Sequence, residues 1–150
     1  VALSQPSLDE GLEYDTIQIK GPPSELVVHR KTTTGLQPVV AGTVFQAGET
    51  LRFQVDIASL GHGMLITRDS RGEKSVLFPN GKTRAAAMNE SAGEMLPGEL
   101  TLGESLEADW VFWVYCSASF ELSDLRFGDA PGILIPSGDC TITSAQLNKE

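Results

Sequence analysis

Residues 48–80, GETLRFQVDIASLGHGMLITRDSRGEKSVLFPN, decide the fold class of this chain. Apolar and polar side chains alternate over residues 51–57, which predicts a strand with one apolar face and one solvated face. Two more extended runs follow at residues 62–67 and 74–78, and between them residues 69–72 have the composition of a tight turn. The pattern predicts three consecutive antiparallel strands arranged as a meander.

Similar extended runs lie on both sides of this stretch and are separated by glycine and proline. They predict further strands at residues 14–20, 25–31, 36–40, 99–102, 133–135 and 139–147. Pro38 places one of these strands at a sheet edge, because proline cannot donate to a ladder. With about eight or nine short strands, the fold class is all-β: an antiparallel β-sandwich with at most one or two short helical turns.

Residues 109–117, DWVFWVYCS, form the most apolar run. Apolar side chains fall on both faces of this predicted strand, so it should lie centrally in a sheet that is covered on both sides. Its tryptophans are then core residues whose N–H groups need partners. The alternative is an exposed aromatic platform built on Trp113 or Tyr115. The next segment, residues 119–126, predicts one or two helical turns with Ser119 as the N-cap.

The chain has 150 residues, which fits a single domain over residues 16–150 preceded by a polar, acidic linker at residues 1–15. It carries 11 basic and 20 acidic residues, a net charge of −9. This balance argues against nucleic acid and anionic membranes as partners, because both require clustered Lys and Arg. No apolar run is long enough to span a bilayer, so this part of the protein is not expected to insert into a membrane.

Residues 81–98, GKTRAAAMNESAGEMLPG, show no strand alternation and are predicted to be mostly loop. Loops of this length are uncommon in compact domains and often serve function. The candidate ligand or partner residues in this loop are Lys82, Arg84, Met88, Asn89 and Glu90. The alternative is a connection that merely covers the sheets.

A search for catalytic motifs finds none of the nucleophile or phosphate-binding signatures. His29 and His62 stand alone in sequence, and we expect His29 to face solvent and His62 to lie in a loop. Asp69 is expected to bond the backbone of its own turn. No cofactor and no metal site are predicted. The abundant carboxylates could still meet in three dimensions, which keeps a carboxylate-based enzyme as a remote alternative.

Two cysteines, Cys116 and Cys140, permit one disulfide. Such a bridge would close a loop of about 25 residues, and the chain-entropy model gives it roughly 3–3.5 kcal/mol. Two buried free thiols are the alternative, and the choice depends on the redox compartment.

The order of turn and packing motifs resembles a family of β-rich bacterial domains. The motifs are residues 20–21 (KG), 25–31 (ELVVHRK), 46–53 (QAGETLRF), 68–72 (RDSRG), 77–79 (LFP), 92–97 (AGEMLP), 110–120 (WVFWVYCSASF) and 135–140 (IPSGDC). Domains of this kind form the extracytoplasmic part of membrane-anchored regulators, including anti-sigma-factor-type proteins of myxobacteria, and occur beside caspase-like peptidases. Gly48-Glu49 stands here where the family pattern has Gly-Asp.

The resemblance implies a non-enzymatic accessory or sensing module that binds a protein partner or a small ligand. It also implies a periplasmic or other extracytoplasmic location, an oxidising compartment for Cys116 and Cys140, and a membrane anchor that precedes residues 1–14. The family brings no catalytic residues. The rival to this reading is a carbohydrate- or surface-binding sandwich that uses exposed aromatic side chains.

Overall fold

The computed structural model of this chain describes residues 13–19, 24–39, 43–103, 110–129, 134–135 and 139–147. Within these ranges the regular elements are thirteen strands and one short 3₁₀ helix, and every ladder between strands is antiparallel. The predicted all-β class is therefore confirmed. There are more strands than the eight or nine expected, because several two- to five-residue strands form where the sequence does not alternate.

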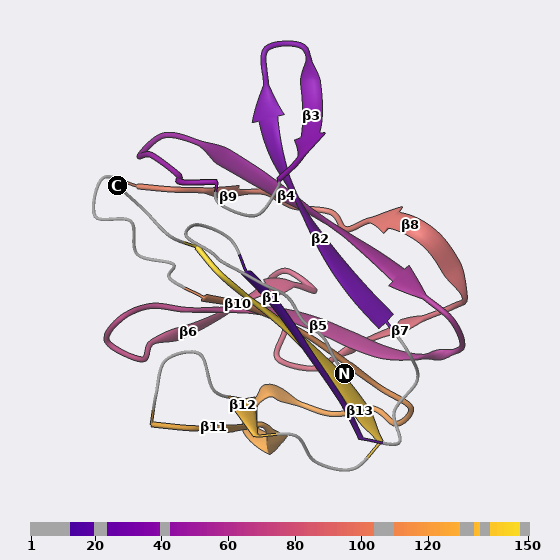
Figure 1. The fold of residues 1–150 in the computed structure, drawn as a ribbon. Helices are drawn as coiled ribbons and strands as arrows, with labels where there is room; N and C mark the ends of the chain where they lie inside the picture. Colours follow the sequence, from indigo (N-terminus) through magenta and orange to yellow (C-terminus); the bar gives the residue numbers. More distant parts are fainter. Residues whose placement is uncertain are drawn as a thin grey trace.

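Two sheets and a two-stranded ribbon are arranged in layers, seen from top to bottom in Figure 1. The five-stranded sheet has the order β3-β2-β4-β8, with β9 also paired to β4. The six-stranded sheet has the order β1-β13-β10-β5-β6, with β7 also paired to β5. A two-stranded ribbon, β11-β12, lies in the bottom layer.

The strand bounds are as follows. The five-stranded sheet contains β2 (Ser24–Thr32), β3 (Gly35–Pro38), β4 (Thr50–Ile57), β8 (Ser91–Met95) and β9 (Leu100–Thr101). The six-stranded sheet contains β1 (Glu13–Ile19), β5 (Gly61–Arg68), β6 (Lys74–Phe78), β7 (Ala86–Met88), β10 (Trp110–Cys116) and β13 (Cys140–Gln146). The ribbon contains β11 (Arg126–Phe127) and β12 (Leu134–Ile135).

The predicted meander is wrong at its first connection. β4 lies in the five-stranded sheet between β2 and β8, whereas β5 lies in the six-stranded sheet between β10 and β6. β4 alternates between buried and more exposed residues, as expected for a sheet with solvent on one side. β5 is buried at seven of its eight positions, which fits a strand covered on both faces. Residues 58–60 thus carry the chain between sheets, and the predicted β5–β6 hairpin is formed.

Two hydrophobic cores lie on opposite faces of β10, which confirms the prediction of a central strand covered on both sides. Trp113 and Tyr115 point into the inner core, between the two sheets. Phe112 and Val114 point into the outer core, on the other face of the six-stranded sheet. Side chains of β10 therefore contribute alternately to the inner core and to the outer core.

The outer core is closed by residues 117–129 together with β12, which we call the cover. Phe120 and Leu134 are buried there against the six-stranded sheet. The predicted helical segment is one 3₁₀ turn, Leu122–Asp124, and Glu121 rather than Ser119 is its N-cap. A carboxylate oxygen of Asp124 accepts the backbone N–H of Glu121 at 2.9 Å, which accounts for this position of the cap.

The disulfide between Cys116 and Cys140 is present, as predicted. The two cysteines face each other directly in the β10–β13 ladder. The cover lies between them in sequence, so the bridge holds together the two strand ends from which the cover departs. Loss of the bridge should therefore loosen the cover before the sandwich.

Close approach between β5 and β10 explains two glycines. A Cβ atom on Gly63 would overlap the ring of Trp113, and one on Gly61 would lie 2.7 Å from the ring of Tyr115. Both contacts would be closer than nonbonded carbon atoms approach, so only glycine fits at these positions. The two buried rings of the inner core thus determine the sequence of the neighbouring strand.

Candidate functional site

Residues 81–98 were predicted to be mostly loop, and this prediction is only partly right. They contain β7, which pairs with β5, and β8, which pairs with β4. The segment is rich in Ala and Gly. Its strand β7 lies end to end with β6 beside β5, and β8 lies end to end with β9 beside β4. Tertiary pairing, rather than an alternating pattern, makes these residues extended.

The five residues proposed in this segment do not form one site. Met88 is buried in the inner core. Arg84 forms an ion pair with Glu121 of the cover at 3.0 Å. Lys82 and Asn89 are exposed and line none of the pockets described below, whereas Glu90 lines a hollow at the start of β8.

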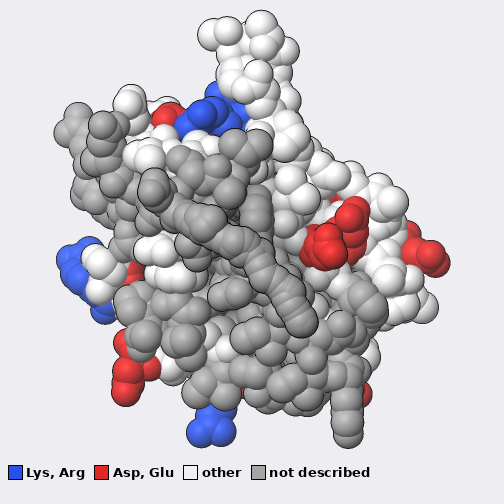
Figure 2. All heavy atoms as spheres, in the orientation of Figure 1, with Lys and Arg blue, Asp and Glu red and all other residues white. Residues whose placement is uncertain are grey.

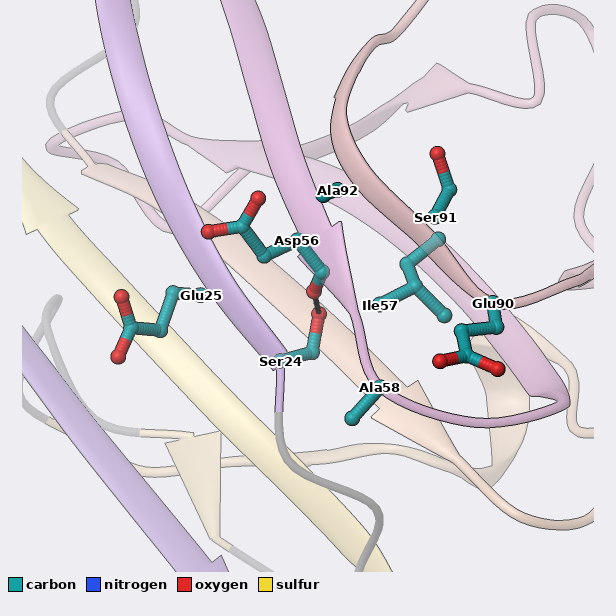
Figure 3. A pocket seen from close by; sticks show the side chains of 8 residues that line it. All are labelled: Ser24, Glu25, Asp56, Ile57, Ala58, Glu90, Ser91 and Ala92. Carbon is teal, nitrogen blue, oxygen red and sulfur yellow. Dashed lines mark hydrogen bonds between the residues drawn. The ribbon is translucent and has the colours of Figure 1, made fainter.

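That hollow, which we call the acidic hollow, has a volume of about 310 Å³. It lies where the ends of β2 and β4 meet the start of β8, as Figure 3 shows. Its lining residues are Ser24, Glu25, Asp56, Ile57, Ala58, Glu90, Ser91 and Ala92.

Three carboxylates line the acidic hollow, and among the described residues no Lys, Arg or His lines it. Glu25 and Asp56 are exposed and directly opposite each other in the β2–β4 ladder. Like charges that face each other directly destabilise a sheet. Figure 3 shows Glu90 on the other side of the hollow. On the face drawn in Figure 2, the coloured side chains over this part of the surface are acidic.

The base of the acidic hollow is held by hydrogen bonds. The Ser24 hydroxyl donates to the backbone carbonyl of Asp56 at 2.5 Å and accepts from the indole N–H of Trp113 at 2.8 Å. A carboxylate oxygen of Asp56 accepts the backbone N–H of Gly93 at 2.6 Å, beside an irregularity in the β4–β8 pairing. The strands around the hollow are thus fixed to the inner core, which favours preorganised binding.

A second pocket, the cover pocket, has a volume of about 470 Å³. It lies between the cover and the strand β6, and its lining residues are Lys74, Thr83, Glu121, Leu122, Ser123, Leu125 and Phe127. The backbone N–H of Leu122 donates to the carbonyl of Thr83 at 2.8 Å, so the cover is tied to the residues before β7.

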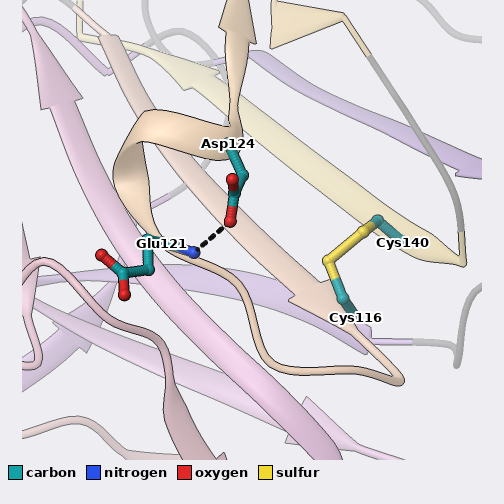
Figure 4. Close-up of a disulfide and its surroundings, with 4 residues drawn as sticks. All are labelled: Cys116, Glu121, Asp124 and Cys140. Atoms are coloured by element: carbon teal, nitrogen blue, oxygen red, sulfur yellow. Dashed lines mark hydrogen bonds between the residues drawn. A yellow bond between two sulfur atoms is a disulfide. The ribbon is translucent and has the colours of Figure 1, made fainter.

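Charges in the cover pocket have partners of different kinds. The Lys74 ammonium lies 4.8 Å from the centre of the Phe127 ring, a cation–π distance. The Phe127 ring packs edge-on against Phe112 of the outer core, with ring centres 5.6 Å apart. Figure 4 shows the Glu121 side chain pointing away from Asp124, and Glu121 is the residue that pairs with Arg84.

Two titratable side chains outside these pockets have shifted pKa values. Hydrogen bonds from the backbone N–H groups of Glu73 and Arg71 hold the pKa of Asp69 below its usual value, despite some burial. This geometry confirms the predicted bonding of Asp69 within its own turn. Burial raises the pKa of Tyr115, and the nearby Glu94 carboxylate adds to the rise.

The expectation that His29 faces solvent is wrong, and the alternative of an exposed aromatic platform is excluded for Trp113 and Tyr115. His29 is buried, and its Nε2 lies 2.6 Å from the side-chain oxygen of Gln54. His62 lies in β5, which confirms the extended run predicted at residues 62–67 and not the loop position. Trp113 and Tyr115 are both 0% exposed, so neither can form a ligand platform.

Sequence patterns did not indicate four of the pocket residues: Glu25, Asp56, Lys74 and Phe127. Glu25 and Asp56 are 31 positions apart and meet only through the β2–β4 register. Phe127 follows the 3₁₀ helix in the short strand β11, which the sequence did not indicate. The polar faces of strands 25–31 and 51–57 contained the acidic pair, but no local signal gives their alignment.

No protein-family model, no curated protein and no solved structure matches this chain. Among the described residues, no helix is long and apolar enough to cross a membrane. The same residues contain no group of three His, Cys, Asp or Glu side chains placed to hold a metal ion. The function therefore has to be argued from the chemistry of the surface pockets.

Proposed function

We propose that this chain is a binding module of an extracytoplasmic regulator and that it docks a basic segment of a protein partner at the acidic hollow. The observation that carries the proposal is the meeting of Glu25, Asp56 and Glu90, from three separate parts of the chain, in one hollow whose described lining residues include no cation. A partner that supplies lysine or arginine would relieve the repulsion between the opposed carboxylates.

Electrostatics and shape both favour a protein segment as the occupant. The net charge of −9 attracts basic partners over distance and speeds their association. Leu60, in the connection that begins with the hollow residue Ala58, is 70% exposed. A partner with alternating basic and apolar side chains could therefore contact the carboxylates and this apolar side chain together.

The disulfide supports an extracytoplasmic location. Structural disulfides persist in oxidising compartments and are rare in the cytosol. The Cys116–Cys140 bridge is therefore in agreement with the periplasmic regulator that the motif resemblance implies. The anchor and the regulator belong to the proposal on the strength of that resemblance.

A carboxylate enzyme is the second candidate, because the acidic hollow does gather carboxylates. Acid–base catalysis usually uses a partly buried group beside an oriented partner. Glu25, Asp56 and Glu90 are all exposed, and the Ser24 hydroxyl at the base of the hollow is hydrogen-bonded to Trp113 and to the backbone. Binding is the function that this arrangement favours.

The test is fluorescence anisotropy with a labelled heptapeptide of alternating lysine and leucine. The double variant Glu25→Gln/Glu90→Gln should bind this peptide about fivefold more weakly, because two exposed charges are removed. The double variant Glu73→Gln/Glu99→Gln removes two exposed carboxylates outside the hollow and serves as the matched control. A glutamate–leucine heptapeptide should not bind. Equal weakening by the control variant would show attraction by net charge alone and would refute the proposed site.

A further inference from the structure

The cover pocket contains a cation without a carboxylate partner among the described residues. The Lys74 ammonium contacts the Phe127 ring, and no described carboxylate lies within ion-pair distance of it. The acidic residue of the same pocket, Glu121, is paired with Arg84 at 3.0 Å. The pocket therefore presents a positive group on a protein whose net charge is strongly negative.

Three apolar side chains form part of the wall of the cover pocket. Leu122, Leu125 and Phe127 line it and are only partly buried, so their apolar surfaces face the open volume. Phe127 is held in place by its edge-on contact with Phe112. A volume of about 470 Å³ is in the range of small-molecule sites, which are roughly 300–1,000 Å³.

Hydroxyl groups complete the polar side of this pocket. Thr83 and Ser123 line it from two different segments, one before β7 and one in the 3₁₀ helix. Hydroxyls and an ammonium group are suitable donors for a carboxylate, and the leucines and the ring suit an apolar chain.

We propose that the cover pocket binds a small carboxylate with an apolar chain. The carboxylate contacts the Lys74 ammonium and the hydroxyls, and the chain lies on Leu122, Leu125 and Phe127. This site is separate from the acidic hollow and takes a ligand of the opposite charge. The module would thus sense a small amphiphilic acid as well as dock a partner.

The test is a ¹H–¹⁵N chemical-shift titration of the unaltered chain with hexanoate and, in parallel, with hexanamide. Hexanoate should give saturable shifts at the amides of Thr83, Ser123 and Phe127. Hexanamide should bind about fivefold more weakly, because it lacks the charge that pairs with lysine. This comparison needs no variant and so does not depend on the folding of a mutant.

Variants of two lysines supply the second arm. Lys74→Gln should weaken hexanoate binding about fivefold, whereas Lys82→Gln should leave it unchanged, because Lys82 is exposed and does not line the pocket. Equal binding of hexanoate and hexanamide, equal effects of the two variants, or shifts that never saturate would each overturn the proposal. Failure here would leave the docking of a basic segment at the acidic hollow unaffected.

Discussion

The acidic hollow and the cover pocket differ in whether their carboxylates have cationic partners. In the hollow, Glu25 and Asp56 face each other in a ladder, and none of the lining residues that the structure describes is a cation. In the cover pocket, Glu121 is paired with Arg84, and Lys74 lies over an aromatic ring. Like charges that face each other in a ladder cost stability, so the presence of Glu25 opposite Asp56 points to a role in binding.

The two sites also differ in what holds them. The acidic hollow is built from three strands of one sheet, and Ser24 connects it to Trp113 in the inner core. One wall of the cover pocket comes from residues 121–127, which lie between Cys116 and Cys140. The hollow therefore depends on the inner core, whereas the pocket depends on the disulfide and the outer core.

The largest effect on stability is expected from Gly63→Ala, which disturbs the packing of the inner core beneath the acidic hollow. The new Cβ would overlap the Trp113 ring in the inner core, and the free energy of unfolding should fall by about 4 kcal/mol or more. Urea denaturation measures the change. Gly103→Ala, where a Cβ would meet nothing within 4 Å, is the control and should change stability by less than about 0.5 kcal/mol. Similar losses in both variants would contradict the packing of the inner core.

Removal of the disulfide should affect the cover pocket and spare the hollow. The double variant Cys116→Ala/Cys140→Ala should lose about 3 kcal/mol of stability, as expected for a closed loop of this length. Hydrogen exchange should accelerate in residues 118–127 while β2 and β4 stay protected. Uniform loss of protection in all strands would show that the cover and the sandwich unfold as one unit.

Single carboxylate variants at the two sites should change the free energy of unfolding slightly and with opposite sign. Glu25→Gln removes a like-charge contact and should raise the free energy of unfolding by about 0.5 kcal/mol. Glu121→Gln removes a partner of Arg84 and should lower it by up to about 0.5 kcal/mol. Thermal unfolding at low salt checks both changes, and high salt should shrink them. Destabilisation by Glu25→Gln would contradict the strain assigned to the acidic hollow.

The smallest effect concerns the inner core at high pH. The Tyr115 hydroxyl donates to the carbonyl of Ser59 at 2.7 Å, and its pKa is raised by burial. Because the folded state favours the protonated phenol, this stabilisation is present below the unfolded pKa of about 10 and is lost as the pH rises through the folded value. Denaturation at increasing pH should show the decline, and Tyr115→Phe should not show it. A decline of equal size in that variant would assign it to other groups.

Local patterns were sufficient for the class of fold and for most strands. The apolar run at residues 109–117 predicted the central strand, because side chains on both of its faces require cover. The alternation at residues 51–57 predicted the half-buried strand β4. These properties depend on each segment alone, and so they could be read from the sequence.

Such local patterns did not predict which distant strands pair or in which register. β4 and β5 are neighbours in sequence but lie in different sheets, because β4 is amphipathic whereas β5 is buried at nearly all positions. Glu25 and Asp56 meet through register, and Lys74 meets Phe127 only after the cover folds back over the sheet. The segment 81–98 was correctly singled out in one respect, because Thr83 lines the cover pocket and Glu90 lines the acidic hollow.

The claim that the two sites bind opposite charges is tested most directly by chemical-shift mapping of one ¹⁵N-labelled sample with two probes. The lysine–leucine heptapeptide should shift the amides of Glu25, Asp56 and Ser91 and leave Ser123 and Phe127 unchanged. Hexanoate should give the reverse pattern. Peptide-induced shifts that are spread over the whole acidic surface, or that are centred on the cover, would contradict the account.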